Sequence, residues 1–404
     1  MSRSASSLRS PRVGMGRRSR VVRLLLCVCL SVMPWLVQAD SWMPPGTEVV
    51  TASDGKTRVT ITPRQIDNSL AYITDKIVGE DKAGQREDGP RQATARVEHK
   101  NAQGKWQVVW QGPLVNDVAP ADTLLSPGGR YLITLDNWFS RGFGDDVIVI
   151  YGDHGQHLHQ LALRQILPSE YVAALPRTTS SRHWNGGATL SEDGEVLRIS
   201  LRVPSRKFDD LSTVPMEIRL SDAQVTLPSG PAWEQALQTA KTEINRQRAR
   251  HDRLQERHSA PLPAPTDASL EAWDFYAREV MYRLESTGEP RILPAKESNE
   301  EPMASLKLEA LLSNMGKPSD FPAFVDTWAL ASPEPLALEA IATRALRQVH
   351  PGSARDVRIV FIGLPEQRTR VTALFEATGV GFRFVDMTQT MAGKPMEPFK
   401  VFDE

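Results

Sequence analysis

Five short stretches between residues 46 and 227 share the pattern that most constrains this chain: a turn ending in glycine, a polar residue, and then an alternating or apolar run. They are SDGKTRVTI, AQGKWQVVW, SPGGRYLITL, DHGQHLHQL and SEDGEVLRISL, with glycine at positions 55, 104, 129, 155 and 194. Asp-Gly and Gly-Gly pairs supply the positive φ that tight hairpins need. The spacing predicts hairpins over about 93–111, 121–136, 146–163, 186–203 and 214–227.

Two of these segments repeat each other closely. LSPGGRYLITL from Leu125 and LSEDGEVLRISL from Leu190 match in Ser, Gly and Leu. The hairpins of residues 45–228 resemble the four-stranded blades of bacterial β-propellers, and the DNW…GxGxxV stretch is similar to one in uncharacterised exported bacterial proteins. The hairpins suffice for at most three blades, whereas a closed ring takes about four to eight. We therefore expect an all-β meander, as a sandwich or as open propeller-like blades.

After Leu227 the apolar spacing changes from two residues to the three and four of a helix. One set of positions, here called the seam, follows this spacing: Trp233, Leu237, Ala240, Ile244, Gln247, His251, Leu254 and His258. The seam is apolar in its first half and polar in its second. The first half is expected to dock on the β part, while the second stays in water or pairs loosely. The prolines of SAPLPAPTD (259–267) end the helix, and few contacts are expected to cross them.

The last third predicts helices followed by a small α/β unit. Helices are expected over about 267–285, 303–314 and 332–348. DVRIVFIG (356–363) predicts a buried strand, PEQRTRVTALFEAT a helix, and VGFRFVDM a second strand. Such a unit pairs its strands in parallel through a right-handed crossover.

These segments predict an α+β fold class in four parts. A signal peptide occupies residues 1–39, and a β-rich domain residues 40–228. An amphipathic helix with a Pro-rich linker follows at 229–266, and a helical plus α/β C-terminal domain at 267–404.

Residues 1–39 have the composition of a secretory signal peptide. Seven arginines and no acidic residue precede or flank an apolar run from Leu24 to Met33, and Ala39 is a small residue at the predicted cleavage point. An uncleaved anchor is the alternative, although the run is shorter than the roughly 20 residues of a membrane-spanning helix. Both cysteines, Cys27 and Cys29, lie in this segment, which excludes disulfides and thiolate metal sites from the mature chain. We expect a periplasmic or secreted protein.

Charge narrows the class of partner. Without the seven arginines of the signal segment, 41 Lys and Arg stand against 49 Asp and Glu, a net charge of −8. That sign does not favour a nucleic-acid partner or an anionic membrane surface. No apolar run long enough to span a membrane follows Ala39.

The stretch DNWFSRGFGDDVIVIYGDHGQHLH, residues 136–159, carries the densest chemistry. Loops that present acceptors and aromatic rings on a rigid sheet are where binding sites arise. We predict a ligand or partner contact made by six side chains: Asp136, Asn137, Trp138, Asp145, Asp146 and, from a second loop, Trp184. The competing interpretation is a flexible bend whose glycines and aspartates serve backbone geometry.

A metal site is the second hypothesis for this stretch. His157 and His159 are expected on one strand face, about 6.5 Å apart at two residues' rise, with Asp153 as a further ligand. Alternatively Asp153 belongs to a hairpin turn and the histidines face solvent. Leu158 lies on the strand face opposite the histidines and could face the core, which favours the second interpretation. Two later leucines, however, share the face of the histidines, so both interpretations remain open.

Trp106 and Trp110 are expected on one face of their strand, with Val108 between them. They form either a sugar-stacking platform or part of the core, and the apolar residue between them favours the core.

Nucleophile, zinc-protease and phosphate-loop motifs are not found in the sequence. The chain is therefore expected to be an exported, non-catalytic binding or scaffolding protein of the bacterial envelope. We expect it to use no cofactor and to contact an envelope protein or a small ligand. The alternative is a metal-dependent envelope hydrolase that uses the Asp/His-rich loop 136–159.

Overall fold

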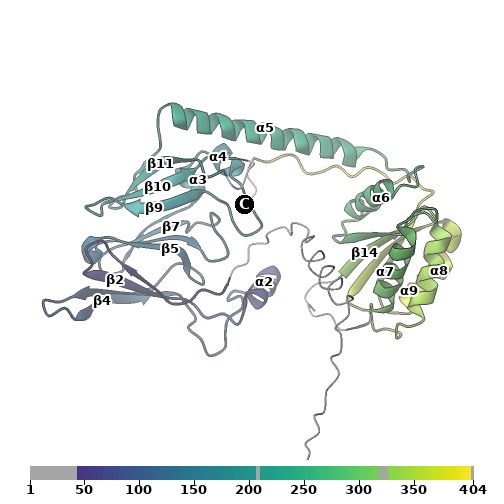
Figure 1. Ribbon diagram of the computed structural model, residues 1–404, viewed down its shortest axis with the longest axis horizontal. Coiled ribbons are helices and arrows are strands. Elements are labelled where there is room, and N and C mark those ends of the chain that lie inside the picture. The colour runs from purple at the N-terminus through teal and green to yellow at the C-terminus, as the bar shows by residue number, and fades with distance from the viewer. Residues whose placement is uncertain (1–42, 206–209, 318–325, 402–404) are drawn as a thin grey trace, which may run out of the picture.

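The computed structural model describes residues 43–205, 210–317 and 326–401, so the predicted signal peptide (1–39) lies outside the described residues. The chain forms three antiparallel sheets, a long helix, and then a parallel sheet with helices (Figure 1). The predicted α+β class is confirmed.

Each antiparallel sheet is a meander of four strands that follow one another in the chain. Sheet 1 contains β1 (Glu48–Thr51), β2 (Thr57–Thr62), β3 (Thr94–Lys100) and β4 (Trp106–Pro113). Sheet 2 contains β5 (Pro120–Leu125), β6 (Leu132–Asn137), β7 (Ile148–Tyr151) and β8 (His157–Leu161). Sheet 3 contains β9 (Asn185–Leu190), β10 (Val196–Arg202), β11 (Thr213–Arg219) and β12 (Val225–Thr226). The five glycines of the repeated pattern precede β2, β4, β6, β8 and β10 with φ between 63° and 75°, as a tight turn requires.

Sheet 2 lies between the other two sheets and buries both of its faces. Its residues Leu132, Val149 and Tyr151 pack in one cluster with Val59, Ile61 and Val97 of sheet 1. Its residues Ile133, Ile148 and Ile150 pack in a second cluster with Ile199, Met216 and Ile218 of sheet 3. Alternate residues of β2 and β10 are more exposed, which leaves the outer faces of sheets 1 and 3 polar.

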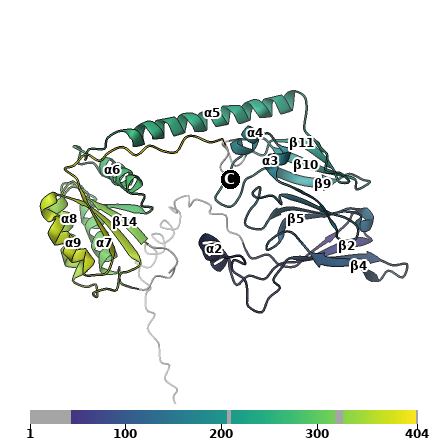
Figure 2. The ribbon, with the colours of Figure 1, turned by 180° about the vertical axis from the view of Figure 1, so that it is seen from behind.

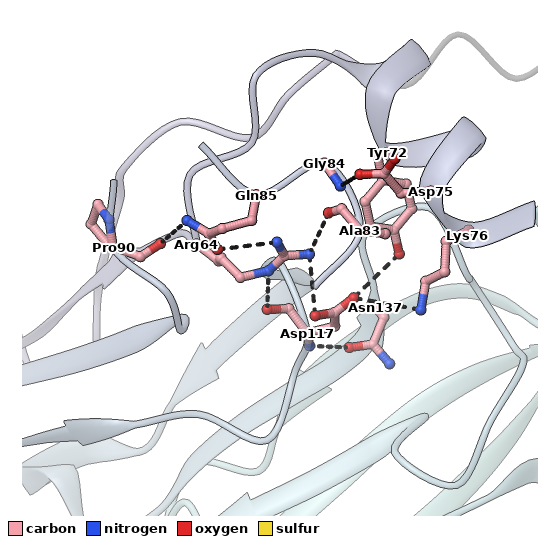
Figure 3. Close-up of polar contacts among 10 residues, drawn as sticks. All are labelled: Arg64, Tyr72, Asp75, Lys76, Ala83, Gly84, Gln85, Pro90, Asp117 and Asn137. Carbon is pink, nitrogen blue, oxygen red and sulfur yellow. Dashed lines mark hydrogen bonds and ion pairs between the residues drawn. The ribbon is translucent and has the colours of Figure 1, made fainter. Parts of the chain in front are cut away.

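Short helices interrupt the β-rich part where the sequence predicts none. They are α2 (Ser69–Val78), η1 (Pro127–Gly129), α3 (Leu163–Ile166) and α4 (Ser169–Ala174). The α2 segment, which joins β2 to β3, is fastened by a buried arginine (Figure 3). Arg64 donates from Nη2 to the Ala83 carbonyl at 3.0 Å and pairs with the Asp117 carboxylate at 3.3 Å. Its charge is thereby neutralised inside the protein, as a buried cation requires.

The seam lies on α5 (Pro231–Ser259), as predicted. Trp233, Ala240 and Ile244 are buried in the cluster that sheets 2 and 3 form, and the Trp233 ring packs on Tyr171 of α4 with centroids 5.0 Å apart. The first half of α5 therefore docks on the β-rich part, which confirms that expectation. The helix continues from there to the α/β unit (Figures 1 and 2).

The α/β unit is a four-stranded parallel sheet rather than the two strands predicted. Its strands are β13 (Glu289–Ile292), β14 (Asp326–Ala331), β15 (Val357–Gly363) and β16 (Gly381–Asp386), in that order across the sheet. Its helices are α6 (Leu270–Arg283), α7 (Glu301–Ser313), α8 (Pro335–Leu346) and α9 (Arg368–Glu376), with η2 (Pro365–Gln367) before the last. Helix α6 covers one face and the other three helices cover the opposite face. The predicted parallel pairing of β15 with β16 is confirmed.

Residues 388–401, here called the strap, run back from β16 along α5 to the β-rich part (yellow in Figures 1 and 2). Lys394 N donates to the His258 carbonyl at 2.7 Å, and Met396 N donates to Gln255 Oε1 at 2.6 Å. At its end, Phe399 and Val401 pack against the cluster of sheets 2 and 3. Of the two alternatives for the polar half of the seam, the structure shows pairing, because the strap lies along it.

The Pro-rich segment 259–266 is also crossed by more contacts than expected. Buried His258 at the end of α5 meets buried Glu279 of α6 at 2.9 Å, and Arg283 donates to the Ala260 carbonyl at 2.9 Å. The strap adds a second connection. Prolines disrupt helices and sheets locally, but they do not prevent side chains on either side from packing. No helix in the described ranges combines the length and apolarity needed to cross a membrane.

Candidate functional site

Asp136, at the end of β6, is buried and holds the loop of residues 136–146, here called the Asp136 loop. Its side chain is 1% exposed. The carboxylate accepts from Gly142 N at 2.7 Å and from Trp184 Nε1 at 3.0 Å to each oxygen. Trp184 is also 1% exposed. The predicted contact residues Asp136 and Trp184 thus do meet, but inside the protein, where they join the loop to the strand β9.

Burial raises the pKa of Asp136 to about 7, although the donors from Gly142 and Trp184 oppose the shift. Because the folded pKa lies above the usual 3.8, the folded protein binds a proton more tightly than the unfolded chain does. We expect this group's contribution to stability to be complete below about pH 4 and to decline as the pH rises to about 7. The slope reaches at most about 1.4 kcal/mol per pH unit. Urea titrations of wild type and Asp136→Asn between pH 4 and 7 measure how the free energy of unfolding depends on pH. If the two proteins show the same pH dependence, the pKa of Asp136 is not raised.

The other predicted contact residues are divided between interior and surface. Asn137 is buried, and its Oδ1 accepts from Asn116 Nδ2 at 3.0 Å (Asn137 also appears in Figure 3). Trp138 is buried against Tyr72, with centroids 5.0 Å apart. Asp145 is exposed and pairs with Arg164, and Asp146 is half-buried. The Trp138 ring and the Asn137 amide therefore consolidate the fold, while Asp145 and Asp146 lie at the far end of the loop.

The predicted histidine pair does not share a strand face. The register of β8 on β7 shifts between Ile150 and Tyr151, so that Tyr151 pairs with His157 and Ile150 pairs with His159. Such a bulge leaves one extra residue on a strand and reverses the facing of the residues beyond it. The His157 ring lies beside Tyr151, whereas His159 Nε2 lies 3.2 Å from the carbonyl of Ser221 in sheet 3. The prediction that His157 and His159 share one strand face is therefore wrong.

The metal hypothesis also lacks its third ligand. Asp153 lies in the β7–β8 turn, where its carboxylate accepts from Gln156 Nε2 at 3.3 Å. Among the residues that the structure describes, no three His, Cys, Asp or Glu side chains are grouped as a metal site would require.

A second bulge separates Trp106 from Trp110. The pairing of β3 with β4 shifts between Val97 and Glu98, so Trp110 opposes Val97 on the buried face while Val108 opposes Glu98 on the outer face. Trp110 is buried, as the core interpretation requires. Trp106 lies on the outer face under the Arg58 guanidinium, 4.2 Å from its ring centroid. The shared face predicted for the two rings is therefore wrong.

The Asp136 loop positions a pair of arginines. Arg182 N donates to the Arg141 carbonyl at 2.8 Å, and a Cβ on Gly142 would come within 2.8 Å of the Arg182 carbonyl oxygen. The chain before Trp184 turns back at residues 178–181, where Thr178 N donates to the Ser181 carbonyl. An antiparallel bridge then sets Arg177 beside Arg182. The two arginines are thus paired across a tight turn, and their side chains leave the same side of the backbone.

These arginines line a cavity of about 270 Å³ between the β-rich part, α5 and the strap. We call it the cationic cavity. Among the residues that the structure describes, its charged lining residues are Arg177, Arg182, Lys400 and Glu397. The Phe399 ring and the amide of Gln247 complete the wall. Burial, and secondly the charge of Arg177, lower the pKa of Arg182, so the two guanidinium groups interact electrostatically.

His251 gives the cavity a further polar group. Its Nε2 lies 2.8 Å from the Glu397 carbonyl, which can only accept, so Nε2 carries the proton. The opposite ring nitrogen, Nδ1, is buried and has no hydrogen-bond partner within the described ranges. The nearest carboxylate oxygen recorded for it belongs to Asp252, at 3.7 Å. A buried nitrogen without a partner is unusual, and here it belongs to a residue of the cavity wall.

Sequence reasoning did not single out this cavity. One signal for it exists, because Arg177 and Arg182 bracket the turn TTSS and a tight turn brings its ends together. His251 was identified as part of the seam but not as a site residue. The strap residues carry no local signal. No model of a known protein family matches the chain, and a search of curated proteins finds no match either.

Proposed function

We propose that the protein is an exported, non-catalytic binding protein of the bacterial envelope whose ligand carries an anionic group held in the cationic cavity. The observation that carries the proposal is the convergence of Arg177, Arg182 and Lys400 on one cavity, where Glu397 is the acidic residue among the described lining residues. Guanidinium groups recognise carboxylates and phosphates through paired hydrogen bonds. The signal-like composition of residues 1–39 supports export.

A binding role is favoured over catalysis by the chemistry of the same residues. Guanidinium and ammonium groups stay protonated near neutral pH and so supply binding charge rather than a general base. The overall charge of the mature chain, −8, also makes this local positive site distinctive. The site is therefore suited to one anionic group on a small ligand or on a partner's side chain or chain end.

Neutralising two exposed cations of the cavity tests this function. We expect Arg177→Gln combined with Lys400→Gln to weaken binding of inorganic phosphate or acetate at least about tenfold. A hydrogen bond to a charged group contributes about 1.5–3 kcal/mol, and 1.4 kcal/mol corresponds to tenfold in affinity. Isothermal titration calorimetry at low ionic strength measures the effect, because salt screens such charges.

The matched control is Arg253→Gln combined with Lys307→Gln. Both residues are exposed, lie outside the cavity lining, and remove the same net charge. The control should bind as the wild type does. Equal loss in both double variants would indicate a general effect of net charge, and no binding of either anion to wild type would refute the proposed function.

A further inference from the structure

The strap is joined to both parts of the molecule and also forms a wall of the cationic cavity. Near its start, Arg283 of α6 donates to the carbonyls of Met391 and Ala392 at 3.2 and 2.9 Å. In its last residues, Glu397 and Lys400 line the cavity. A single segment therefore connects the α/β unit to the proposed binding site.

Between these ends the strap is held by backbone contacts of α5 and the linker. Met391 exchanges two hydrogen bonds with Leu262, each 3.0 Å long. At Gly393 the strap passes so close to the end of α5 that a Cβ there would collide with the backbone of Ser259. The buried pair of His258 and Glu279 lies at the same joint. The strap thus follows one path along α5, set by specific contacts at several points.

We infer that the strap is a latch that couples occupancy of the cationic cavity to the joint between the β-rich part and the α/β unit. This inference rests on the proposed function. A ligand that contacts Lys400 and the Arg177–Arg182 pair is bound only while the strap is in place. Ligand binding must then stabilise the attached strap, and a loosened strap must weaken ligand binding by the same factor.

Hydrogen exchange on the unmodified full chain tests whether ligand binding stabilises the attached strap. The amides of Met391, Lys394 and Met396 are protected by their bonds to the linker and α5. With inorganic phosphate at ten times its Kd, we expect their exchange to slow about tenfold, since opening must first release the ligand. Amides of α7 should exchange at an unchanged rate. Bound phosphate with unchanged exchange in the strap would overturn the latch.

A substitution in the strap, far from the cavity, tests whether a loosened strap weakens ligand binding. Gly393→Val forces the strap away from Ser259 without altering any residue that lines the cavity. We expect phosphate affinity to fall about tenfold, while Gly46→Val, which has open space around it, leaves affinity unchanged. Equal affinity of Gly393→Val and wild type would overturn the latch but leave the proposed function standing. No phosphate binding to wild type would overturn both.

Discussion

Replacing Trp184 by alanine is expected to lower the free energy of unfolding by at least about 3–5 kcal/mol. That range is typical for removing a buried tryptophan and leaving a cavity. Here the loss is larger, because Trp184 Nε1 donates to both oxygens of buried Asp136. Urea unfolding followed by far-UV circular dichroism measures the change. A typical domain has a net stability of about 5–15 kcal/mol, so the variant is expected to be close to unfolding.

Trp184→Phe separates the two contributions. Phenylalanine keeps an aromatic ring but removes the donor, which leaves the Asp136 carboxylate under-satisfied at a cost of about 1–3 kcal/mol. Trp106→Ala is the matched control, because Trp106 is a tryptophan on the polar outer face of sheet 1. Trp106→Ala should lower the free energy of unfolding much less than Trp184→Ala does. If the two alanine variants unfold alike, the Asp136–Trp184 contact does not consolidate the β-rich part.

Ending the chain at Leu227 is expected to deprive the β-rich part of most of its stability. The fragment 40–227 lacks α5, whose Trp233 and Ile244 side chains are buried against sheets 2 and 3. Burying a large apolar side chain contributes about 1.5–3 kcal/mol, so these two side chains alone contribute roughly 3–6 kcal/mol, a large share of a typical net stability of about 5–15 kcal/mol. The exposed apolar surface should also make this fragment aggregate.

The fragment 40–258 is expected to unfold cooperatively, at a temperature between those of fragment 40–227 and the full chain. It keeps the apolar half of the seam but lacks Phe399 and Val401, which the strap packs against the same cluster. It also leaves His258 without Glu279. Differential scanning calorimetry of the three proteins gives the order. If the two fragments melt at the same temperature, α5 does not belong to this domain. If fragment 40–258 melts at the same temperature as the β-rich part of the full chain, the strap does not stabilise that part.

Local patterns in the sequence determined the hairpins of the β-rich part and one face of the longest helix. Glycine at a tight turn and alternation along a strand act through the backbone of neighbouring residues, so the hairpins that turn at Gly104, Gly155 and Gly194 could be predicted. The seam of α5 could be predicted for the same reason, since residues three and four apart lie on one helix face. The sequence did not predict the helices α2 and α4, which are short.

At the two bulges, the alternation of side chains along a strand no longer predicts which face a residue lies on. Residues two apart share a face only in a regular strand, and one extra residue on β4 or β8 reverses the face. Whether the extra residue is present depends on the partner strand, which local sequence does not specify. That is why Trp106 and Trp110, and likewise His157 and His159, were placed on one face and lie on two.

The candidate site was decided by tertiary structure, apart from the turn that pairs Arg177 with Arg182. The acceptors and rings of the Asp136 loop predicted a surface contact, but burial by β9 turned Asp136 and Trp184 into an internal pair. The cationic cavity brings together residues from the turn at 177–182, α5 and the strap, which are more than 60 and 140 residues apart in the chain. Turn and helix patterns operate over a few residues, whereas this arrangement depends on how the strap returns along the polar half of α5. The sequence by itself determined that α5 has such a face, and only the packing of the whole chain determined what covers it.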